Sequence, residues 1–484
     1  MALVSPPLGA TVPASPHATV VSLPTLADVE GYERKDPATL RHITVGYPRF
    51  VRNRLVGAAA ARAAAALGRT GELFPLVSRA AALAWAARAG AEVTSLDEVG
   101  DWVLLTTPPG DAAARLAKFV QHTGILISSR QADAYLAPER RHVGGSPAPV
   151  QAALAPYLAG VAPADILLAT SGMNAVAAAI AAVDAVQRPR GRRAWIQLGW
   201  LYVDSTRLLE KAAAAPHHFV ADVRDLAAVE RLLAAGDVAG VLTELPNNPQ
   251  LETADVPALR ALCDRHGARL LLDPSSVGLA TVDVLPWADV LCSSLTKYAA
   301  AEGDVMAGVL AVNPSRPDAA ALLAAARATL SPLHPLDLAA LAAQVGRLGE
   351  VTARLSATAA ELARRLAAHP AVARVRTADT GPTATAFRAL RRPGAGAGAL
   401  ITIELRGEMR GVYDRLRVVK GPSFGLRYTL AAPFLWLAHF EEVTSEQGRA
   451  SIRAAGLDPD LLRISVGLEP IEEIWSAFVA ALPK

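Results

Sequence analysis

The chain has 484 residues, of which 52% are hydrophobic and 19% charged, and its formal net charge is +3. This composition is typical of a globular protein with more than one domain and excludes a disordered or fibrous chain. No dense block of Lys and Arg points to nucleic acid or to an anionic membrane as a partner. The only cysteines, Cys263 and Cys292, lie in apolar segments, so we expect buried free thiols and no cysteine-based metal site. A signal-peptide pattern and a long apolar run are both missing, which predicts a cytoplasmic protein.

The first part of the chain carries no chemistry that the sequence reveals. Residues 1–30 are rich in Pro, Ala, Val and Thr without periodicity, which predicts a mobile arm. Residues 31–147 are expected to form an N-terminal α+β extension. Its expected elements are helices over 56–67, 73–89 and 111–120 and a hairpin over 91–107.

Residues 148–330 change character, because short apolar segments there alternate with helical ones. The expected strands are 166–169, 194–198, 218–221, 238–243, 269–272, 290–292 and 306–312, and the expected helices are 173–186, 226–234 and 256–266. This order is typical of a large, mostly parallel sheet covered on both faces. Ligands bind at the carboxyl ends of the strands in such sheets.

Two short segments follow the first two of these strands. Ser171-Gly172-Met173 opens a helix, where small residues let backbone N–H groups and the helix dipole meet a phosphate. Trp200 and Tyr202 follow the next strand, and their aromatic rings suit either stacking on a cofactor or packing in the core.

Two polar side chains follow later strands. Asn248 lies in Glu244-Leu245-Pro246-Asn247-Asn248-Pro249 and suits a donor to a phenolate oxygen, or an ordinary Asn-Pro turn. Asp273 follows three leucines, where a carboxylate costs free energy unless it meets a cation. A pyridinium N–H would be such a partner. The alternative is a helix N-cap with Pro274 at the first helical position.

The segment Ser293-Ser294-Leu295-Thr296-Lys297 follows the apolar run 290–292 and carries the most information. Desolvation lowers the pKa of a lysine and makes the amine nucleophilic near neutral pH. Such a lysine can form a Schiff base while the hydroxyls of Ser294 and Thr296 hold a phosphate. Pyridoxal phosphate (PLP) is the common cofactor that needs both, and the accompanying segments turn this weak motif into a prediction.

Residues 331–484 are expected to form a smaller C-terminal α+β domain. Its expected elements are a long helix over 336–368, strands over 400–405, 426–430 and 462–466, and a final helix over 471–482. Arg463 lies in an apolar strand, which suits either a buried ion pair or a clamp for a substrate carboxylate.

At these residues the sequence resembles the Cys/Met-metabolism family of PLP enzymes, which includes cystathionine γ-synthase, cystathionine lyases and methionine γ-lyase. The matching segments are Ser171-Gly172-Met173, Glu244-x-Pro246-x-Asn248-Pro249, Ser294-x-Thr296-Lys297-Tyr298, 304–308 and 463–469. The match is closer still to the long fungal-type cystathionine γ-synthases, through segments at 46–50, 118–123, 128–130 and 421–439. The resemblance implies a fold-type I transferase, similar to aspartate aminotransferase, that is a homodimer or homotetramer with small amino-acid substrates.

The resemblance also implies a role for each matched position. Lys297 would be the Schiff-base lysine and the proton shuttle. The cofactor phosphate would be held by Ser171, Gly172, Met173, Ser294 and Thr296, and by Arg130 of a neighbouring subunit. Asp273 would pair with the pyridine nitrogen and Asn248 with the ring oxygen, while Arg463 and Ser423 would bind the substrate carboxylate.

Two tyrosines of the shorter family members are absent. Ser128-Ser129-Arg130 replaces the usual Tyr-Ser-Arg, and Leu198 replaces the tyrosine that stacks on the cofactor ring. Trp200 and Tyr202 are then the candidates for that stacking.

The resemblance implies γ-replacement on an O-acyl-L-homoserine by a thiol, with cysteine giving cystathionine for methionine biosynthesis by trans-sulfuration. Alternatives on the same scaffold are a β- or γ-lyase and γ-replacement by another nucleophile in secondary metabolism. A further alternative is a PLP-like fold that has lost catalysis. A nicotinamide-dependent dehydrogenase is disfavoured because no G-x-G-x-x-G follows an early strand.

Overall fold

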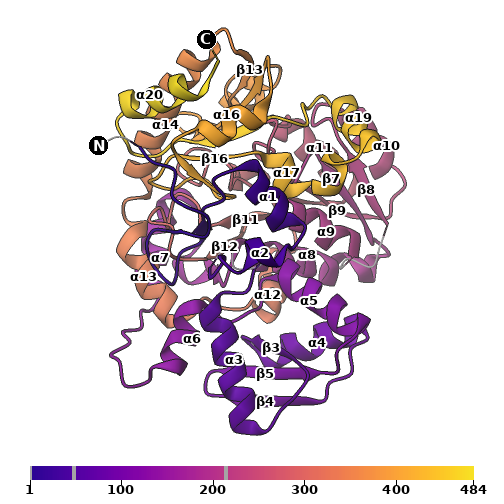
Figure 1. Ribbon diagram of the computed structural model, residues 1–484. Helices are drawn as coiled ribbons and strands as arrows, with labels where there is room; N and C mark the ends of the chain where they lie inside the picture. Colours follow the sequence, from indigo (N-terminus) through magenta and orange to yellow (C-terminus); the bar gives the residue numbers. More distant parts are fainter. Residues whose placement is uncertain (1–2, 46–50, 212–215, 484) are drawn as a thin grey trace.

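The structure is a computed structural model and describes residues 3–45, 51–211 and 216–483. It has three tiers in Figure 1: a small N-terminal sheet at the bottom, a large central sheet, and a C-terminal sheet at the top. The Gly46-Tyr47-Pro48-Arg49-Phe50 segment of the resemblance lies outside the described residues.

The central sheet has seven strands in the order β6-β12-β11-β10-β9-β7-β8. Their bounds are β6 Leu167–Ala169, β7 Ala194–Leu198, β8 His217–Val220, β9 Val238–Glu244, β10 Arg269–Asp273, β11 Val290–Ser294 and β12 Gly308–Val312. Strands β8, β7, β9, β10 and β11 pair in parallel, and β12 runs antiparallel to both of its neighbours. The predicted α/β fold with a mostly parallel sheet is confirmed.

Helices cover both faces of this sheet, and two separate apolar cores result. The helices are α7 Pro147–Leu154, α8 Gly172–Gln187, α9 Val203–Lys211, α10 Leu226–Leu233, α11 Val256–His266, α12 Ala319–Thr329 and α13 Pro335–Val345. Helices α8, α9 and α12 pack on one face, while α7, α10, α11 and α13 pack on the other. Alternate residues of β7 divide between the two cores, with Trp195 in one and Ile196 in the other, as strand geometry requires.

The C-terminal sheet has five strands in the order β13-β14-β17-β16-β15. The strands are β13 Val372–Arg376, β14 Leu400–Leu405, β15 Val419–Lys420, β16 Leu430–Ala432 and β17 Leu462–Ser465. The helices of this part are α14 Leu348–Ala367, α15 Ala384–Leu390, α16 Met409–Arg415, α17 Phe434–Ala438, α18 Phe440–Val443, α19 Glu446–Ala454 and α20 Ile471–Ala481. Among the described helices of the whole chain, none combines the length and the apolar character that a bilayer crossing requires.

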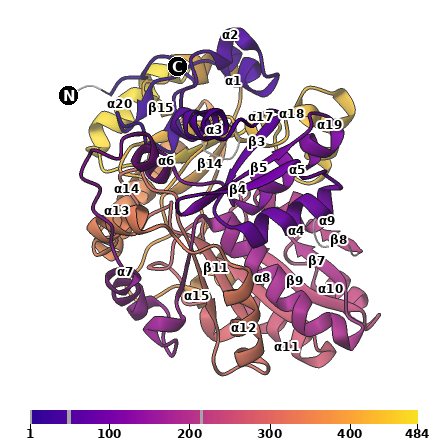
Figure 2. The same cartoon turned by 90° about the horizontal axis from the view of Figure 1, so that it is seen from below.

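The N-terminal tier is a three-stranded antiparallel sheet with helices on both faces, and Figure 2 shows it from below. Its elements are α3 Arg54–Leu67, β3 Glu72–Leu76, α4 Arg79–Ala89, β4 Ser95–Val99, β5 Trp102–Thr107, α5 Asp111–Thr123 and α6 Ser129–Leu136. Helices α3 and α6 pack on one face, and α4 and α5 on the other. Helix α5 also contacts α8 and α9 of the central domain.

The prediction of a mobile arm over residues 1–30 is wrong for the residues that the structure describes. Strands β1 (Thr11–Val12) and β2 (Val20–Val21) and helix α1 (Leu26–Glu33) pack on the C-terminal sheet, followed by α2 (Pro37–Leu40). The hydroxyl of Tyr413 donates to the Leu23 carbonyl at 2.8 Å, and Lys420 Nζ donates to the Pro24 carbonyl at 2.6 Å. The segment lacks periodicity because its strands have only two residues each. They pair with one another in a small antiparallel sheet, and the chain then runs along edge strand β15, where the Leu23 N–H donates to the Lys420 carbonyl at 2.9 Å.

Three predicted elements differ from the structure. Residues 73–76 belong to strand β3 and not to the start of a helix, because β5 pairs with them. The long helix predicted over 336–368 is two helices, α13 and α14, with a break at Gly346 and Arg347. The strand predicted over 426–430 begins at Leu430 as β16.

Candidate active site

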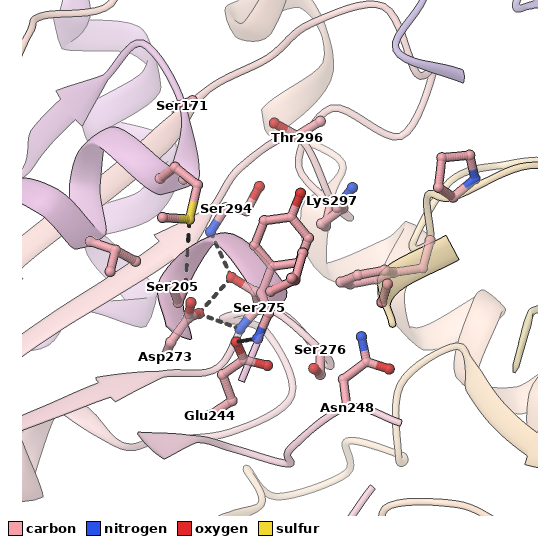
Figure 3. Close-up of a pocket in the computed structure, with 18 of the residues that line it drawn as sticks. Ser171, Ser205, Glu244, Asn248, Asp273, Ser275, Ser276, Ser294, Thr296 and Lys297 are labelled. Carbon is pink, nitrogen blue, oxygen red and sulfur yellow. Dashed lines mark hydrogen bonds between the residues drawn. The ribbon is translucent and has the colours of Figure 1, made fainter. Parts of the chain in front are cut away.

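One cavity, open to solvent, lies at the carboxyl ends of the central strands and faces the C-terminal domain. Figure 3 shows its polar side chains gathered around it. We call one set of lining residues the polar floor: Ser171, Gly172, Asn248, Asp273, Ser294, Thr296 and Lys297. We call another set the apolar wall: Val203, Met306, Phe424, Phe434, Leu437 and Ala438.

The N-terminus of α8 forms one end of the floor. Ser171 is the N-cap, and its hydroxyl accepts the Asn174 N–H at 3.0 Å. Gly172 is the first helical residue, and a Cβ there would lie 2.7 Å from the Ser294 Cβ. The close approach of α8 to the end of β11 therefore requires glycine, and it brings helix N–H groups beside the Ser294 hydroxyl. This is a geometry that binds a phosphate.

Lys297 lies just beyond β11 and is 4% exposed. Its Nζ donates to Ser423 Oγ at 2.8 Å and lies 4.8 Å from the centroid of the Phe424 ring. The next residue, Tyr298, has a φ of +52°, and its hydroxyl donates to the Ser276 carbonyl at 2.8 Å. Its N–H also donates to the Gly425 carbonyl at 2.8 Å, so the backbone that carries Lys297 is fixed on both sides.

Two buried carboxyl groups end neighbouring strands of the floor. Asp273 of β10 and Glu244 of β9 are register partners, and both line the cavity. Burial raises the pKa of Asp273 to about 6, although hydrogen bonds from the Ser275 hydroxyl and N–H oppose the rise. Burial, and then the charge of Asp273, raise the pKa of Glu244 well above its usual range. The pair therefore favours a proton on Glu244 and the negative charge on Asp273.

Arg463 of β17 reaches the cavity from the C-terminal domain. Its guanidinium lies 5.2 Å from the centroid of the Phe424 ring and 4.9 Å from that of Phe434. Its Nη2 donates to the Ser423 carbonyl at 3.2 Å. The aromatic rings restrict the guanidinium, which leaves it suited to a planar anion such as a carboxylate.

The structure brings most of the predicted site residues to this cavity and separates two from it. Tyr202, Met173 and Asn248 line it, and Ser423 reaches it through Lys297. Trp200 does not line it, because its ring packs edge-on against Phe219 and His439 at centroid distances of 5.8 and 5.1 Å. Of the two stacking candidates, Tyr202 is the one beside the floor.

Arg130 is the second predicted residue that lies elsewhere. Its Nη2 donates to Asp304 Oδ2 at 2.7 Å, and its Nη1 lies 3.4 Å from Asp337 Oδ1. These residues line a separate cavity that shares Met306 with the first. The predicted contact of Arg130 with the phosphate of a neighbouring subunit stays a prediction.

The alternative reading of Asp273 as a helix N-cap is wrong, because a turn and not a helix follows β10. The sequence reasoning also missed several lining residues. These are Ser205, Glu244, Ser275, Ser276 and the apolar wall. Glu244 had a usable signal, since it ends a fully buried strand in the same way as Asp273. The wall had no local signal, because it joins α9, α17 and loops that are distant in the sequence. Segments 304–308 and 421–439 of the family resemblance contain most of its residues but gave them no role.

Comparison with known proteins assigns this site to a family. The model for Cys/Met metabolism PLP-dependent enzymes matches residues 146–483. The chain belongs to this family. The prediction of the family and of its PLP cofactor is confirmed.

Two relatives within the family differ in their similarity to the chain. An L-2-amino-4-chloropent-4-enoate dechlorinase/desaturase of Streptantibioticus cattleyicolor is 42% identical over 492 residues, which cover 99% of this chain and 98% of the relative. The cystathionine gamma-synthase of Neurospora crassa is 31% identical over 355 residues, which cover 70% of this chain and 56% of the relative. The first relative is therefore the more similar of the two, and it includes the N-terminal extension.

Solved structures of the family share the fold. The cystathionine gamma synthase of Xanthomonas oryzae pv. oryzae in complex with cystathionine superposes with a TM-score of 0.57 at 24% identity, over 65% of this chain and 80% of that one. This agreement confirms the predicted fold-type I architecture.

The described residues fit PLP. The floor provides a helix N-terminus without space for a Cβ at Gly172, a buried lysine and a buried aspartate. Asn248 lines the cavity, and its buried Oδ1 has no hydrogen-bond partner among the described residues, so this oxygen does not fix the orientation of the amide; turned with its NH₂ group toward the cavity, the side chain would donate to the ring oxygen of PLP. Lys297 would bind the cofactor covalently, Asp273 would pair with its ring nitrogen, and Ser294 and Thr296 would hold its phosphate.

Proposed function

We propose that the protein catalyses a PLP-dependent γ-elimination that removes a leaving group from Cγ of an apolar amino acid and introduces a carbon–carbon unsaturation. The observation that carries this proposal is the apolar wall, which lines the same cavity as Lys297 and brings the Phe424 ring centroid within 4.8 Å of Lys297 Nζ. A substrate side chain in that place would meet the rings of Phe424 and Phe434 and the aliphatic groups of Val203 and Leu437. Such surroundings favour a short hydrocarbon side chain with a leaving group such as chloride.

The cations of the site support the same substrate class. Of the described residues that line the cavity, Lys297 and Arg463 carry the cationic side chains. Arg463 would bind the substrate α-carboxylate and Lys297 the cofactor. No further lining cation among these residues is then left for an acidic acyl group on the substrate side chain.

The reaction balances without an oxidant or a reductant. The bond from Cγ to the leaving group breaks and the leaving group keeps the electron pair, one proton is lost, and one carbon–carbon π bond forms. When bound, PLP supplies the electron sink that makes protons at Cα and Cβ acidic. Lys297 Nζ would move those protons, and its contact with Ser423 Oγ holds it on the side of Arg463.

The similarity to the dechlorinase/desaturase supports the proposal independently, because it extends over nearly the whole chain. In the name of that relative, the amino group is on C2 and the chlorine on C4, which is Cγ. We infer that a γ-chloro, γ,δ-unsaturated amino acid belongs to the substrate class of this protein.

γ-Replacement on an O-acyl-L-homoserine by cysteine, which the sequence predicts, is the second candidate. The similarity to the Neurospora crassa cystathionine gamma-synthase favours it. Both reactions would use Lys297, Asp273 and Arg463, so these residues do not distinguish the two. It differs in needing a thiol at Cγ, next to the apolar wall.

The test supplies both reactions to purified protein with PLP. One sample contains L-2-amino-4-chloropent-4-enoate, and released chloride and the product mass are measured. The other contains O-acetyl-L-homoserine and L-cysteine, and cystathionine is measured. Our proposal predicts one chloride per amino acid consumed and a product lighter by HCl that keeps its amino nitrogen. Cystathionine formation without chloride release would establish the second candidate instead.

A further inference from the structure

The N-terminal extension contacts the site through four consecutive residues at the end of α5, Gln121, His122, Thr123 and Gly124, which we call segment 121–124. Gln121 Nε2 donates to Asp204 Oδ1 at 3.1 Å, and the His122 ring lies with Nδ1 at 2.9 Å from the same oxygen. Asp204 belongs to the first turn of α9, between Val203 and Ser205. Both of those neighbours line the catalytic cavity.

The second half of segment 121–124 contacts residues 170–174, the turn between β6 and α8 that would bind the phosphate of PLP and that we call the phosphate-binding turn. The Thr123 carbonyl accepts Asn174 Nδ2 at 3.1 Å, and the Gly124 carbonyl accepts Thr170 Oγ1 at 2.9 Å. These partners flank Ser171. A Cβ at Gly124 would lie 2.1 Å from Ser171 Oγ, so the backbone of the extension rests directly on the N-cap of α8.

Segment 121–124 thus joins two parts of the cavity that come from different elements. On one side is the N-terminus of α8, and on the other is the start of α9, which follows Tyr202. A further contact links the two parts, because Ser205 Oγ donates to Met173 Sδ at 3.4 Å. His122, Asn174 and Asp204 are each at most 4% exposed. Buried polar contacts of this kind define one arrangement, because a broken contact leaves a desolvated group without its partner.

We propose that segment 121–124 is a positioning element of the active site, which fixes the phosphate-binding turn of α8 relative to the start of α9 through the His122–Asp204 pair. The N-terminal extension is then required for tight PLP binding, because it supplies this segment. The proposal rests on the family's cofactor and not on the proposed substrate. PLP binding in a protein that releases no chloride would contradict the proposed function and leave this inference standing.

The test uses full-length apoprotein titrated with PLP, with cofactor absorption and visible circular dichroism as readouts. His122→Ala removes the ring nitrogen from Asp204, and we expect about tenfold weaker PLP binding and a changed visible dichroism. His122→Asn places an amide N–H near the position of Nδ1 and should restore both. Gln121→Ala, which removes the second donor to Asp204, should weaken binding about two- to threefold.

The chain offers a matched control in the second His–Asp pair between the extension and the central domain. His334 Nε2 lies 2.7 Å from Asp101 Oδ2, and Asp101 is largely exposed. Asp101→Ala breaks this pair at a place that does not line the cavity, so we expect PLP binding within about twofold of wild type.

Two results would overturn the inference. One is a folded His122→Ala protein that binds PLP like wild type, with the same visible dichroism. The other is a His122→Asn protein that loses as much affinity as His122→Ala, since the link through Nδ1 would then be irrelevant. If His122→Ala does not fold, the PLP affinities of Gln121→Ala, His122→Asn and wild type are compared instead. Weaker PLP binding by Gln121→Ala, together with wild-type binding by His122→Asn, supports the inference, and any other result contradicts it.

Discussion

The polar floor and the apolar wall of the catalytic cavity differ in origin and in chemistry. The floor comes from the carboxyl ends of parallel strands and from the N-terminus of α8, and it presents hydroxyls, an amide, a carboxylate and a lysine. The wall comes from α9, α17 and loops, and it presents hydrocarbon and aromatic groups. We propose a matching difference in role, in which the floor would hold the PLP cofactor that the family shares and the wall would select the substrate.

The largest expected effect follows from Lys297→Ala, which removes the amine of the floor. A positioned acid–base group alone contributes roughly 10²–10⁴ in rate, and the covalent bond to PLP is lost as well, so we expect kcat to fall by about 10³ or more. Turnover and the absorption of the cofactor between about 300 and 500 nm measure both losses. A variant that keeps turnover would show that another group moves the protons.

Arg463→Lys is expected to have the next largest effect. The change keeps the charge but loses the planar pair of donors, so we expect KM for the amino acid to rise by about 10–100-fold. PLP affinity should stay within about twofold, because Arg463 would contact the substrate and not the cofactor. Steady-state kinetics and a PLP titration separate the two quantities. A fall in PLP affinity without a change in KM would place Arg463 with the floor.

Leu437→Ala tests the wall itself. Loss of aliphatic contact from one side chain should lower kcat/KM for an apolar substrate by about tenfold. The absorption spectrum and the PLP affinity should not change, since Leu437 lies in α17 and not on a strand end. The opposite pattern, with weaker PLP binding and unchanged kcat/KM, would contradict the division between floor and wall.

Asp273→Asn tests how the buried carboxyl group of the floor affects the thermal stability of the apoprotein. Burial raises the pKa of Asp273 from 3.8 to about 6 in the folded protein, so folding favours the protonated carboxyl group. The stability that this preference contributes is fully present below pH 3.8 and is lost as the pH rises through about 6. The anion then costs the apoprotein about 2–3 kcal/mol at pH 8. We expect the apoprotein of the variant to melt about 2–5 °C higher than wild type at pH 8, with a smaller gain at pH 5.

The PLP-loaded protein is the control for that prediction. There the Asp273 anion would face the ring nitrogen, so the same substitution should lower the melting temperature. An equal gain in apoprotein and loaded protein at pH 8 would show that Asp273 does not contact the cofactor.

Trp200→Phe is expected to have the smallest effect. The ring packs against Phe219 and His439 outside the cavity, so kcat/KM and PLP affinity should stay within about twofold of wild type. A strong change in the absorption of the bound cofactor would restore Trp200 as the residue that stacks on the ring.

The sequence predicts the floor far better than the wall, and the reason is physical. Each floor residue follows a short apolar strand, and carboxyl ends of parallel strands meet at one edge, so Asp273 and Lys297 are placed together by periodicity and order alone. The residues of the wall meet through tertiary packing of α9, α17 and the loop of Phe424. Nothing local in Leu437 or Val203 distinguishes a cavity wall from a core.

The same reasoning explains the errors elsewhere. Residues 1–30 were expected to be mobile because no periodicity marks them, although Leu23 and Leu26 pack on the C-terminal sheet. Residues 121–123 belong to the matching segment 118–123, but the role that we propose for them depends on contacts with Asp204 and Asn174, about 50 to 80 positions later in the chain.

The most direct test of the central claim is the release of chloride from the γ-chloro amino acid by wild-type protein and by Leu437→Ala, both saturated with PLP. We predict stoichiometric chloride release by wild type, a product that has lost HCl and kept nitrogen, and about tenfold lower kcat/KM in the variant. Cofactor bound by both proteins, with cystathionine formed from O-acetyl-L-homoserine and cysteine and no chloride released, would contradict the claim that the wall selects an elimination substrate.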